Sequence, residues 1–282
     1  KNEVLFCNED ENHLENKEEY GRIICVDNTG NLIWKYLFKD SVECIGEKIP
    51  PYYSSRIIDI IEENNSPVLY CLARNNNTFT SPVFRLDAKT GHRLPGLLWN
   101  PGHIIFGIFW DVNQDGKKDL VLSGSNNAFE LPFIMAVDRS NLLGETPARG
   151  KYKLIGVPPA NLIQYILIPK SDYTLYQNVY RTGAPGTLRY SDYEKTINLG
   201  IGEIFGSDND VTYKFSLNLK SCSLLVGNTY KIKRDSLVSA GILDYPLTDT
   251  DAYCKLMTDQ VVFWNGERFV KLNENSQSFF RE

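Results

Sequence analysis

The sequence lacks a long apolar segment, a basic block and the signature of a common catalytic centre. No run approaches the roughly 18 apolar residues that a membrane helix needs. The formal net charge is −5 and lysine and arginine form no cluster, so we expect no nucleic-acid partner. The motifs H-E-x-x-H and G-x-S-x-G and a phosphate-binding glycine loop are all missing. We therefore expect no catalytic residue and no catalysis by this chain alone.

Histidine is scarce and cysteine is scattered. The three histidines are far apart in the sequence, which favours surface or hydrogen-bonded roles over catalysis: His13, His92 and His103. The cysteines contain no C-x-x-C pair, which argues against a zinc site: Cys7, Cys25, Cys44, Cys71, Cys222 and Cys254. Buried free thiols and disulfides formed in an oxidising compartment are both compatible with this spacing.

The residues that are present favour β-structure. Aromatic residues make up 12% of the chain, and β-branched residues crowd the apolar runs. No stretch keeps a 3.6-residue apolar period, so we expect an all-β fold with almost no helix. The N-terminus has no signal-peptide pattern and starts at Lys1, so we expect the chain to be part of a larger protein, without a membrane span in this fragment.

One ten-residue stretch, D-V-N-Q-D-G-K-K-D-L at 111–120, concentrates oxygen ligands between two apolar runs. Counted from its first residue, side-chain oxygens fall at positions 1, 3, 5 and 9, glycine at position 6 allows a sharp turn, and position 7 offers a backbone carbonyl. Calcium takes roughly six to eight oxygen ligands, and this spacing supplies most of them. The predicted Ca²⁺ ligands are Asp111, Asn113, Asp115, Lys117 and Asp119.

The flanks of this loop separate the alternatives. An EF-hand needs a glutamate at position 12 and a helix on each side, but position 12 is Leu122. The runs at 104–110 and 120–124 read as short buried strands instead. A solvated acidic turn that binds no metal tightly is the other alternative, and the sequence leaves it open.

Two patterns recur along the first half of the chain. A D-x-x-G turn separates two strand-like runs within 21–36; the pattern recurs at 84–91, which ends D-A-K-T-G, and in degraded form at 134–140. Residues 57–70 align without gaps on 109–122, at an offset of 52, and place Asp59 on Asp111. Two of the four side-chain ligands are replaced in that copy, so we expect it to hold no metal. A period near 50 residues with several strands per unit is typical of a propeller.

The D-x-N-x-D-G-x-x-D-L loop in a strand-loop-strand setting resembles the FG-GAP or VCBS repeat, the integrin-α-like β-propeller blade. The D-x-x-G hairpin followed by a tryptophan-bearing strand is similar to the outer hairpins of quinoprotein-type blades. The resemblance covers about residues 20–140 and implies a single propeller over 1–273, complete or not, with about five to seven blades, one Ca²⁺ loop and a polar tail at 274–282. Beyond about residue 145 we expect strands at 162–168 and 211–219 and hairpins at 223–233 and 261–270.

The resemblance implies a non-catalytic, calcium-stabilised module for ligand binding, sensing or protein interaction. It would hold a protein or carbohydrate ligand on its loop face. Loops of this kind bind weakly enough to need millimolar calcium, which implies an extracellular or periplasmic location. The alternative is the propeller portion of a secreted carbohydrate-active or quinone-type redox enzyme, because the same fold also carries catalysts.

Overall fold

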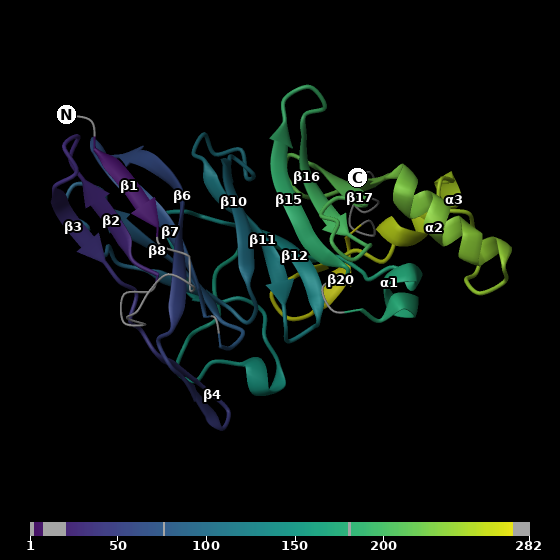
Figure 1. Ribbon diagram of the computed structural model, residues 1–282, viewed down its shortest axis with the longest axis horizontal. Helices are drawn as coiled ribbons and strands as arrows, with labels where there is room; N and C mark the ends of the chain where they lie inside the picture. The colour runs from purple at the N-terminus through teal and green to yellow at the C-terminus, as the bar shows by residue number, and fades with distance from the viewer. Residues whose placement is uncertain (1–2, 8–20, 76, 180–181, 273–282) are drawn as a thin grey trace, which may run out of the picture. The chain divides into compact units, whose positions relative to one another are not determined.

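The computed structural model describes residues 3–7, 21–75, 77–179 and 182–272, and these residues are mostly β-structure (Figure 1). Strands account for 45% and helices for 12%, which confirms the mostly-β expectation. The described strands form several open sheets, and none of these sheets closes on itself. No helix within the described ranges is long and apolar enough to cross a membrane. The predicted tail at 274–282 and His13 lie outside the described residues.

The chain divides into two compact units. The first, here the N-terminal unit, comprises residues 1–104, 126–129 and 140–161. The second, here the C-terminal unit, comprises residues 105–125, 130–139 and 162–282. A single propeller domain over 1–273 stays a prediction.

The N-terminal unit contains a three-stranded sheet, a five-stranded sheet and a separate hairpin. The three-stranded sheet has the order β1 (Val4–Cys7), β2 (Ile23–Val26), β3 (Leu32–Tyr36). The five-stranded sheet has the order β13 (Leu143–Glu145), β9 (Leu97–Asn100), β8 (Ser81–Asp87), β7 (Ser66–Asn75), β6 (Tyr53–Glu63). The hairpin pairs β4 (Val42–Cys44) with β5 (Glu47–Ile49).

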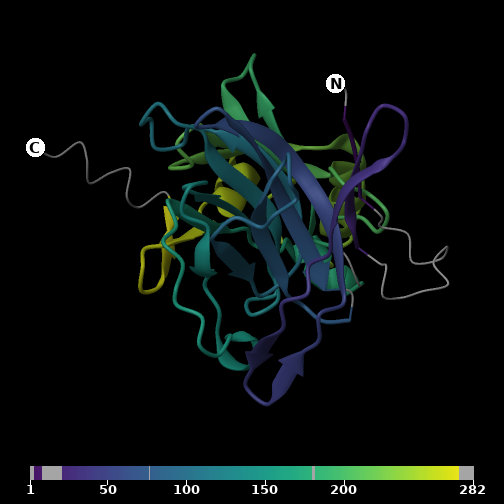
Figure 2. The ribbon, with the colours of Figure 1, turned by 90° about the vertical axis from the view of Figure 1, so that its left-hand side faces the viewer.

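An aromatic core joins the two sheets of the N-terminal unit. The ring centroid of Phe38 lies 5.0 Å from those of Tyr53 and Phe84, and all three side chains are buried. Figure 2 shows the β4–β5 hairpin at the lower edge of this unit, beside the 3-10 turn η3 (Gly150–Tyr152). The backbone N–H of Ile155 donates to the carbonyl of Glu43 at 2.7 Å and ties the segment after η3 to the hairpin.

A tryptophan connects the two predicted turns at Asp27–Gly30 and Asp87–Gly91 within the N-terminal unit. The indole N–H of Trp34, on the strand after the first hairpin, donates to the carbonyl of Ala88 in the second at 3.0 Å. Gly91 lies under the indole ring, where a Cβ atom would stand only 2.5 Å from Trp34 Cε3. Its φ of +69° also suits glycine. The glycine of the second turn, four residues after Asp87, therefore lies where the tryptophan needs close approach.

The C-terminal unit contains two sheets and three α-helices. One sheet has the order β10 (Ile104–Trp110), β11 (Asp119–Asn126), β12 (Leu131–Val137), β14 (Gln164–Leu167), β19 (Val262–Trp264), β20 (Phe269–Lys271). The other runs β15 (Ala184–Ser191), β16 (Thr196–Gly202), β17 (Val211–Ser216), β18 (Cys222–Val226). The helices are α1 (Asp172–Gln177), α2 (Asn228–Ser239) and α3 (Asp251–Thr258).

One apolar core runs through the C-terminal unit. It contains Ile134 and Ile166 from the first sheet, Leu199 from the second, and Tyr230 and Tyr253 from helices α2 and α3. Figure 1 shows β10, β11 and β12 beside β15, and helices α2 and α3 beyond β17. Along β17 the buried residues Val211, Tyr213 and Phe215 alternate with polar ones, so one face of the β15–β18 sheet is apolar and packs into this core.

The three α-helices correct the expectation of almost no helix, and one predicted hairpin is wrong. Residues 223–233 form β18 and the start of α2, so Gly227 is the N-cap of a helix rather than a turn residue. The buried positions Tyr230, Arg234 and Val238 recur every four residues, which is the spacing of one helix face. The polar arginine at the centre of that face hides the pattern from a reading based on apolar residues.

Candidate metal-binding loop

The predicted calcium loop lies between two strands of the C-terminal unit. Trp110 ends β10 and Asp119 begins β11, so strands flank the loop on both sides and an EF-hand is excluded. Gln114 and Gly116 have φ values of 62° and 85° and turn the chain sharply. The turn predicted at Gly116 is present, and no Cβ contact constrains this glycine.

Side-chain oxygens of this loop accept hydrogen bonds from its own backbone N–H groups. The carboxylate of Asp111 accepts from the N–H of Asp115 at 3.1 Å and of Gly116 at 3.0 Å. Asn113 Oδ1 accepts from the N–H of Asp115 at 3.0 Å, and Asp115 Oδ1 accepts from the N–H of Lys117 at 2.8 Å. The acidic side chains therefore set the loop conformation from within, before any metal is considered.

Asp119 closes the loop from its far end. Its side chain is only 3% exposed, and its Oδ2 accepts from the N–H groups of Val112 at 2.9 Å and Asn113 at 3.4 Å. Burial raises the pKa of Asp119, the two N–H donors oppose this, and the charges of Asp115 and Asp111 add to it. The three carboxylates are thus close enough to repel one another.

The donor atoms match calcium better than their arrangement does. All predicted ligands offer hard oxygen atoms. Among the described residues, however, no group of three or more His, Cys, Asp or Glu side chains is placed to share one metal ion. The structure therefore brings Asp111, Asn113, Asp115 and Asp119 into one hydrogen-bonded loop without converging them on a point, and Ca²⁺ binding stays a prediction.

The aligned segment at 57–70 has a different local structure. Asp59 lies inside strand β6, opposite Tyr70 of β7, and Asn64 and Asn65 form a tight turn with φ values of 49° and 62°. No loop is available there to gather oxygen ligands. That this segment holds no metal stays a prediction.

A hairpin emerges beside the acidic loop. Trp110 stacks on Tyr190 at the end of β15, with ring centroids 4.2 Å apart and ring planes 21° apart. Loop 111–119 follows one of these residues, and the tip of the β15–β16 hairpin follows the other. The stack therefore fixes the starting points of two neighbouring loops in the C-terminal unit.

The hairpin tip is braced by polar contacts around one exposed aromatic side chain. Asp192 accepts from the Tyr190 hydroxyl at 3.0 Å and pairs with Lys195 at 2.5 Å. Glu194 pairs with Lys214 at 2.6 Å. Tyr193, between the two braced acids, is 97% exposed.

A second buried carboxylate repeats the contact made by Asp119. Asp210 directly precedes β17, is 6% exposed, and accepts from the backbone N–H of Ile204 at 2.7 Å. The residue after β16 is Glu203, which is 1% exposed and accepts hydrogen bonds from the hydroxyls of Ser171 and Thr174. Asp208, Asn209 and Asp210 read as a possible second ion site or a solvated turn in the sequence, whereas Glu203 belongs to no D-x-N-x-D-G pattern and gave no signal.

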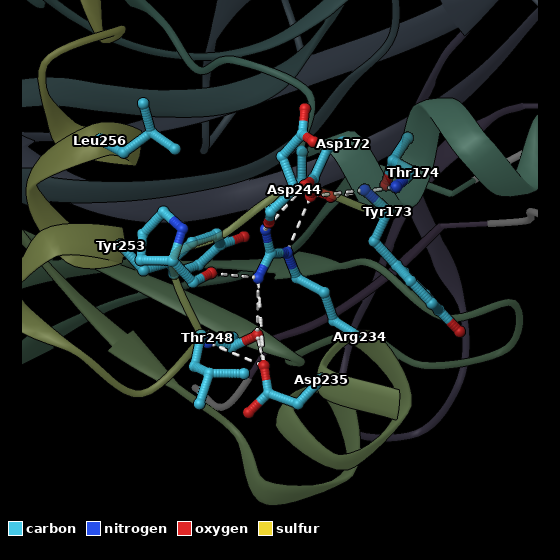
Figure 3. Close-up of polar contacts among 12 residues, drawn as sticks. Asp172, Tyr173, Thr174, Arg234, Asp235, Asp244, Thr248, Tyr253 and Leu256 are labelled. Carbon is cyan, nitrogen blue, oxygen red and sulfur yellow. Dashed lines mark hydrogen bonds and ion pairs between the residues drawn. The ribbon is translucent and has the colours of Figure 1, made fainter. Parts of the chain in front are cut away.

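Arg234 is the centre of a polar network that sequence reasoning also missed (Figure 3). Its guanidinium donates to both carboxylate oxygens of Asp172, at 2.8 and 2.7 Å, and to the Pro246 carbonyl at 2.8 Å. The Thr248 hydroxyl accepts at 3.2 Å, and the ring of Tyr253 lies 4.3 Å from the guanidinium carbon. Asp172 and Arg234 are 62 residues apart in the chain, so no local spacing signals their contact.

His103 has the hydrogen-bonded role expected of the histidines. Its Nε2 lies 3.0 Å from the carbonyl oxygen of Asn75 and 3.1 Å from that of Thr78. The six cysteines, all of them among the described residues, form no disulfide, and burial raises the pKa of Cys25, Cys44, Cys71, Cys222 and Cys254.

Comparison of the chain with protein-family models, with curated proteins and with solved structures finds no match.

Proposed function

We propose that this chain is a non-catalytic, calcium-stabilised β-propeller-type module that binds a ligand outside the cytoplasm, in an extracellular or periplasmic setting. The observation that carries the proposal is the loop 111–119, where three carboxylates and an amide lie within nine residues between strands β10 and β11. The mutual repulsion of the carboxylates disfavours the metal-free loop, and a divalent cation reverses this effect.

The propeller part of the proposal, with about five to seven blades, draws support from the packing within each unit. Sheets of mostly antiparallel strands share one apolar core in the N-terminal unit and another in the C-terminal unit. The Trp34 contact to Ala88 and Gly91 joins successive hairpins as it would in neighbouring blades. In a propeller, each blade packs against a neighbouring blade to bury its apolar side chains.

The loop face of the proposed module is formed by loop 111–119 and the 191–196 hairpin tip. Tyr193 offers a large, 97% exposed aromatic surface between Asp192 and Glu194, which pair with Lys195 and Lys214. Exposed tyrosine with a polar rim suits a protein or carbohydrate ligand, because the ring supplies contact area at a low cost in side-chain entropy. Calcium in the adjacent loop would hold this face in one conformation.

Calcium titration calorimetry tests the proposal directly. We expect one site with a Kd of roughly 10⁻⁴–10⁻³ M, the range of extracellular calcium modules. Asp115→Ala should abolish the binding heat. Asp59→Ala removes an exposed carboxylate from the aligned strand and should leave the heat unchanged. A chain that shows no saturable calcium heat at millimolar concentration contradicts the proposal.

A further inference from the structure

Helix α1 is attached to the end of strand β16 through Glu203. The Glu203 side chain is 1% exposed, and its carboxylate accepts from the hydroxyl of Ser171, the N-cap of α1, and from that of Thr174 in the first turn. Gln177, at the other end of α1, donates its side-chain amide to the Glu203 backbone carbonyl at 2.9 Å. One residue thus binds α1 at both ends.

The described ionisable groups that interact with Glu203 belong to α1, α2, α3 and β17 and to the residue before β17, and they are acids and tyrosines rather than bases. The charges of two carboxylates, Asp172 and Asp210, raise the pKa of Glu203. The charge of Glu203 in turn raises the pKa of four tyrosines: Tyr173, Tyr213, Tyr230 and Tyr253. Arg234 forms a bidentate ion pair with Asp172, so its positive charge is already balanced by that carboxylate. Among the described residues, hydroxyl groups are the hydrogen-bond partners of the Glu203 carboxylate.

This environment disfavours an ionised carboxylate. Burial raises the pKa of Glu203 to about 6; the two hydroxyl donors oppose the rise, and the charges of Asp210 and Asp172 add to it. The C-terminal unit contains no histidine, because the three histidines of the chain are at 13, 92 and 103.

We propose that Glu203 is a proton-operated latch, which holds α1 on the end of β16 when its carboxyl is protonated and loosens α1 when the carboxyl ionises. Opening of α1 exposes the carboxyl to water, where it ionises at its ordinary pKa. Because the closed state binds the proton more tightly, the latch is strongest below about pH 4.5 and weakens as the pH rises through about 6.

Helix α1 transmits this change to the other helices of the C-terminal unit. Asp172, the first residue of α1, anchors Arg234 of α2, and Arg234 in turn holds the carbonyls of Asp244 and Pro246 in the segment before α3 (Figure 3). Release of α1 therefore removes the Asp172 carboxylate from the hydrogen-bond network around Arg234. The helices that cover the β15–β18 sheet are held most tightly in acid.

Native-state hydrogen exchange across α1 tests the latch. After correction for the intrinsic exchange rate, we expect the opening equilibrium constant of residues 171–178 to rise about tenfold between pH 5 and pH 8. Peptides of strand β12 report whether the whole unit opens, and they should not follow this curve. Opening of α1 that is independent of pH overturns the proposal.

Two variants and a control assign the effect. Glu203→Gln keeps the shape without the charge, so α1 should stay protected at pH 8. Thr174→Val removes one hydroxyl donor that favours the ionised form, so the midpoint should move above pH 6. Glu194→Gln changes an exposed carboxylate of the β15–β16 hairpin and should leave the α1 profile unchanged. A pH dependence that persists in Glu203→Gln, or a midpoint unmoved in Thr174→Val, overturns the proposal.

Discussion

At the scale of single residues, burial decides which acidic side chains are chemically unusual. Asp119, Glu145 and Glu203 are all less than a tenth exposed, and burial is the leading cause of the raised pKa of each. The acidic loop at 111–119 was visible in the sequence because its ligands are neighbours in the chain. The environments of Glu145 and Glu203 were not, because no local motif marks them, and the partners of Glu203 lie 32 and 29 residues away.

Glu145 gives a prediction at this scale. Its Oε1 accepts from the N–H of Leu154 at 2.9 Å; burial raises its pKa to about 7, while this N–H bond and the charge of Lys153 oppose the rise. A raised carboxyl pKa makes the contribution of Glu145 to stability fall as the pH rises from about 4.5 through about 7. Glu145→Gln keeps the acceptor and should raise the free energy of unfolding at pH 8 by about 1–2 kcal/mol.

Urea unfolding at pH 5 and pH 8 measures this effect. The difference between variant and unmutated chain should be small at pH 5 and grow by pH 8. Glu47→Gln changes an exposed carboxylate on the β4–β5 hairpin and serves as the control. A Glu145→Gln variant that is less stable than the unmutated chain at pH 8 would show that the charged form is favoured at this position.

At the scale of elements, turn chemistry predicted the hairpins and failed for the helices. The Asp27–Gly30 turn between β2 and β3 is present as predicted, and the predicted hairpin at 261–270 is present with residues 265–268 connecting β19 and β20. Such turns are specified by residues next to each other in the chain. Helices α2 and α3 have tyrosines and an arginine on their buried faces. These side chains are buried because the tyrosines pack into the core with the β15–β18 sheet and the arginine pairs with Asp172.

The contact between Trp34 and Gly91 gives a prediction for the packing of elements. Gly91→Ala places a methyl group against the indole ring and also strains a positive φ, so we expect a loss of about 2–4 kcal/mol in unfolding free energy. Gly30→Ala has a similar φ of +88° but no neighbour within 4 Å, so it should cost only about 1 kcal/mol.

Chemical denaturation of the two variants separates steric clash from backbone strain. The account requires Gly91→Ala to be clearly the more destabilising of the two. Trp34→Phe, which removes the indole N–H donor to Ala88, should cost about 1 kcal/mol. Equal losses for the two glycine variants would mean that the tryptophan does not lock the hairpins together.

At the scale of the whole molecule, the sequence predicted the fold class but not the division of the chain. Mostly-β structure followed from aromatic and β-branched runs, whereas the two compact units interleave segments such as 126–129 and 140–161. Interleaving depends on contacts between distant segments, which no local pattern specifies. The propeller, its calcium and its location outside the cytoplasm remain one linked proposal, because millimolar calcium is what makes a weak loop useful.

We propose that loop 111–119 stabilises this chain by binding Ca²⁺, and a thermal melt with Ca²⁺ and with chelator tests this proposal. At millimolar Ca²⁺ the linkage should be about 1–2 kcal/mol, which corresponds to a rise of roughly 2–8 °C in Tm for a chain of this size. Asp115→Ala should melt at the same temperature in both buffers. If the unmutated chain also melts at one temperature in both buffers, the loop is only an acidic turn, and the proposed location falls with it.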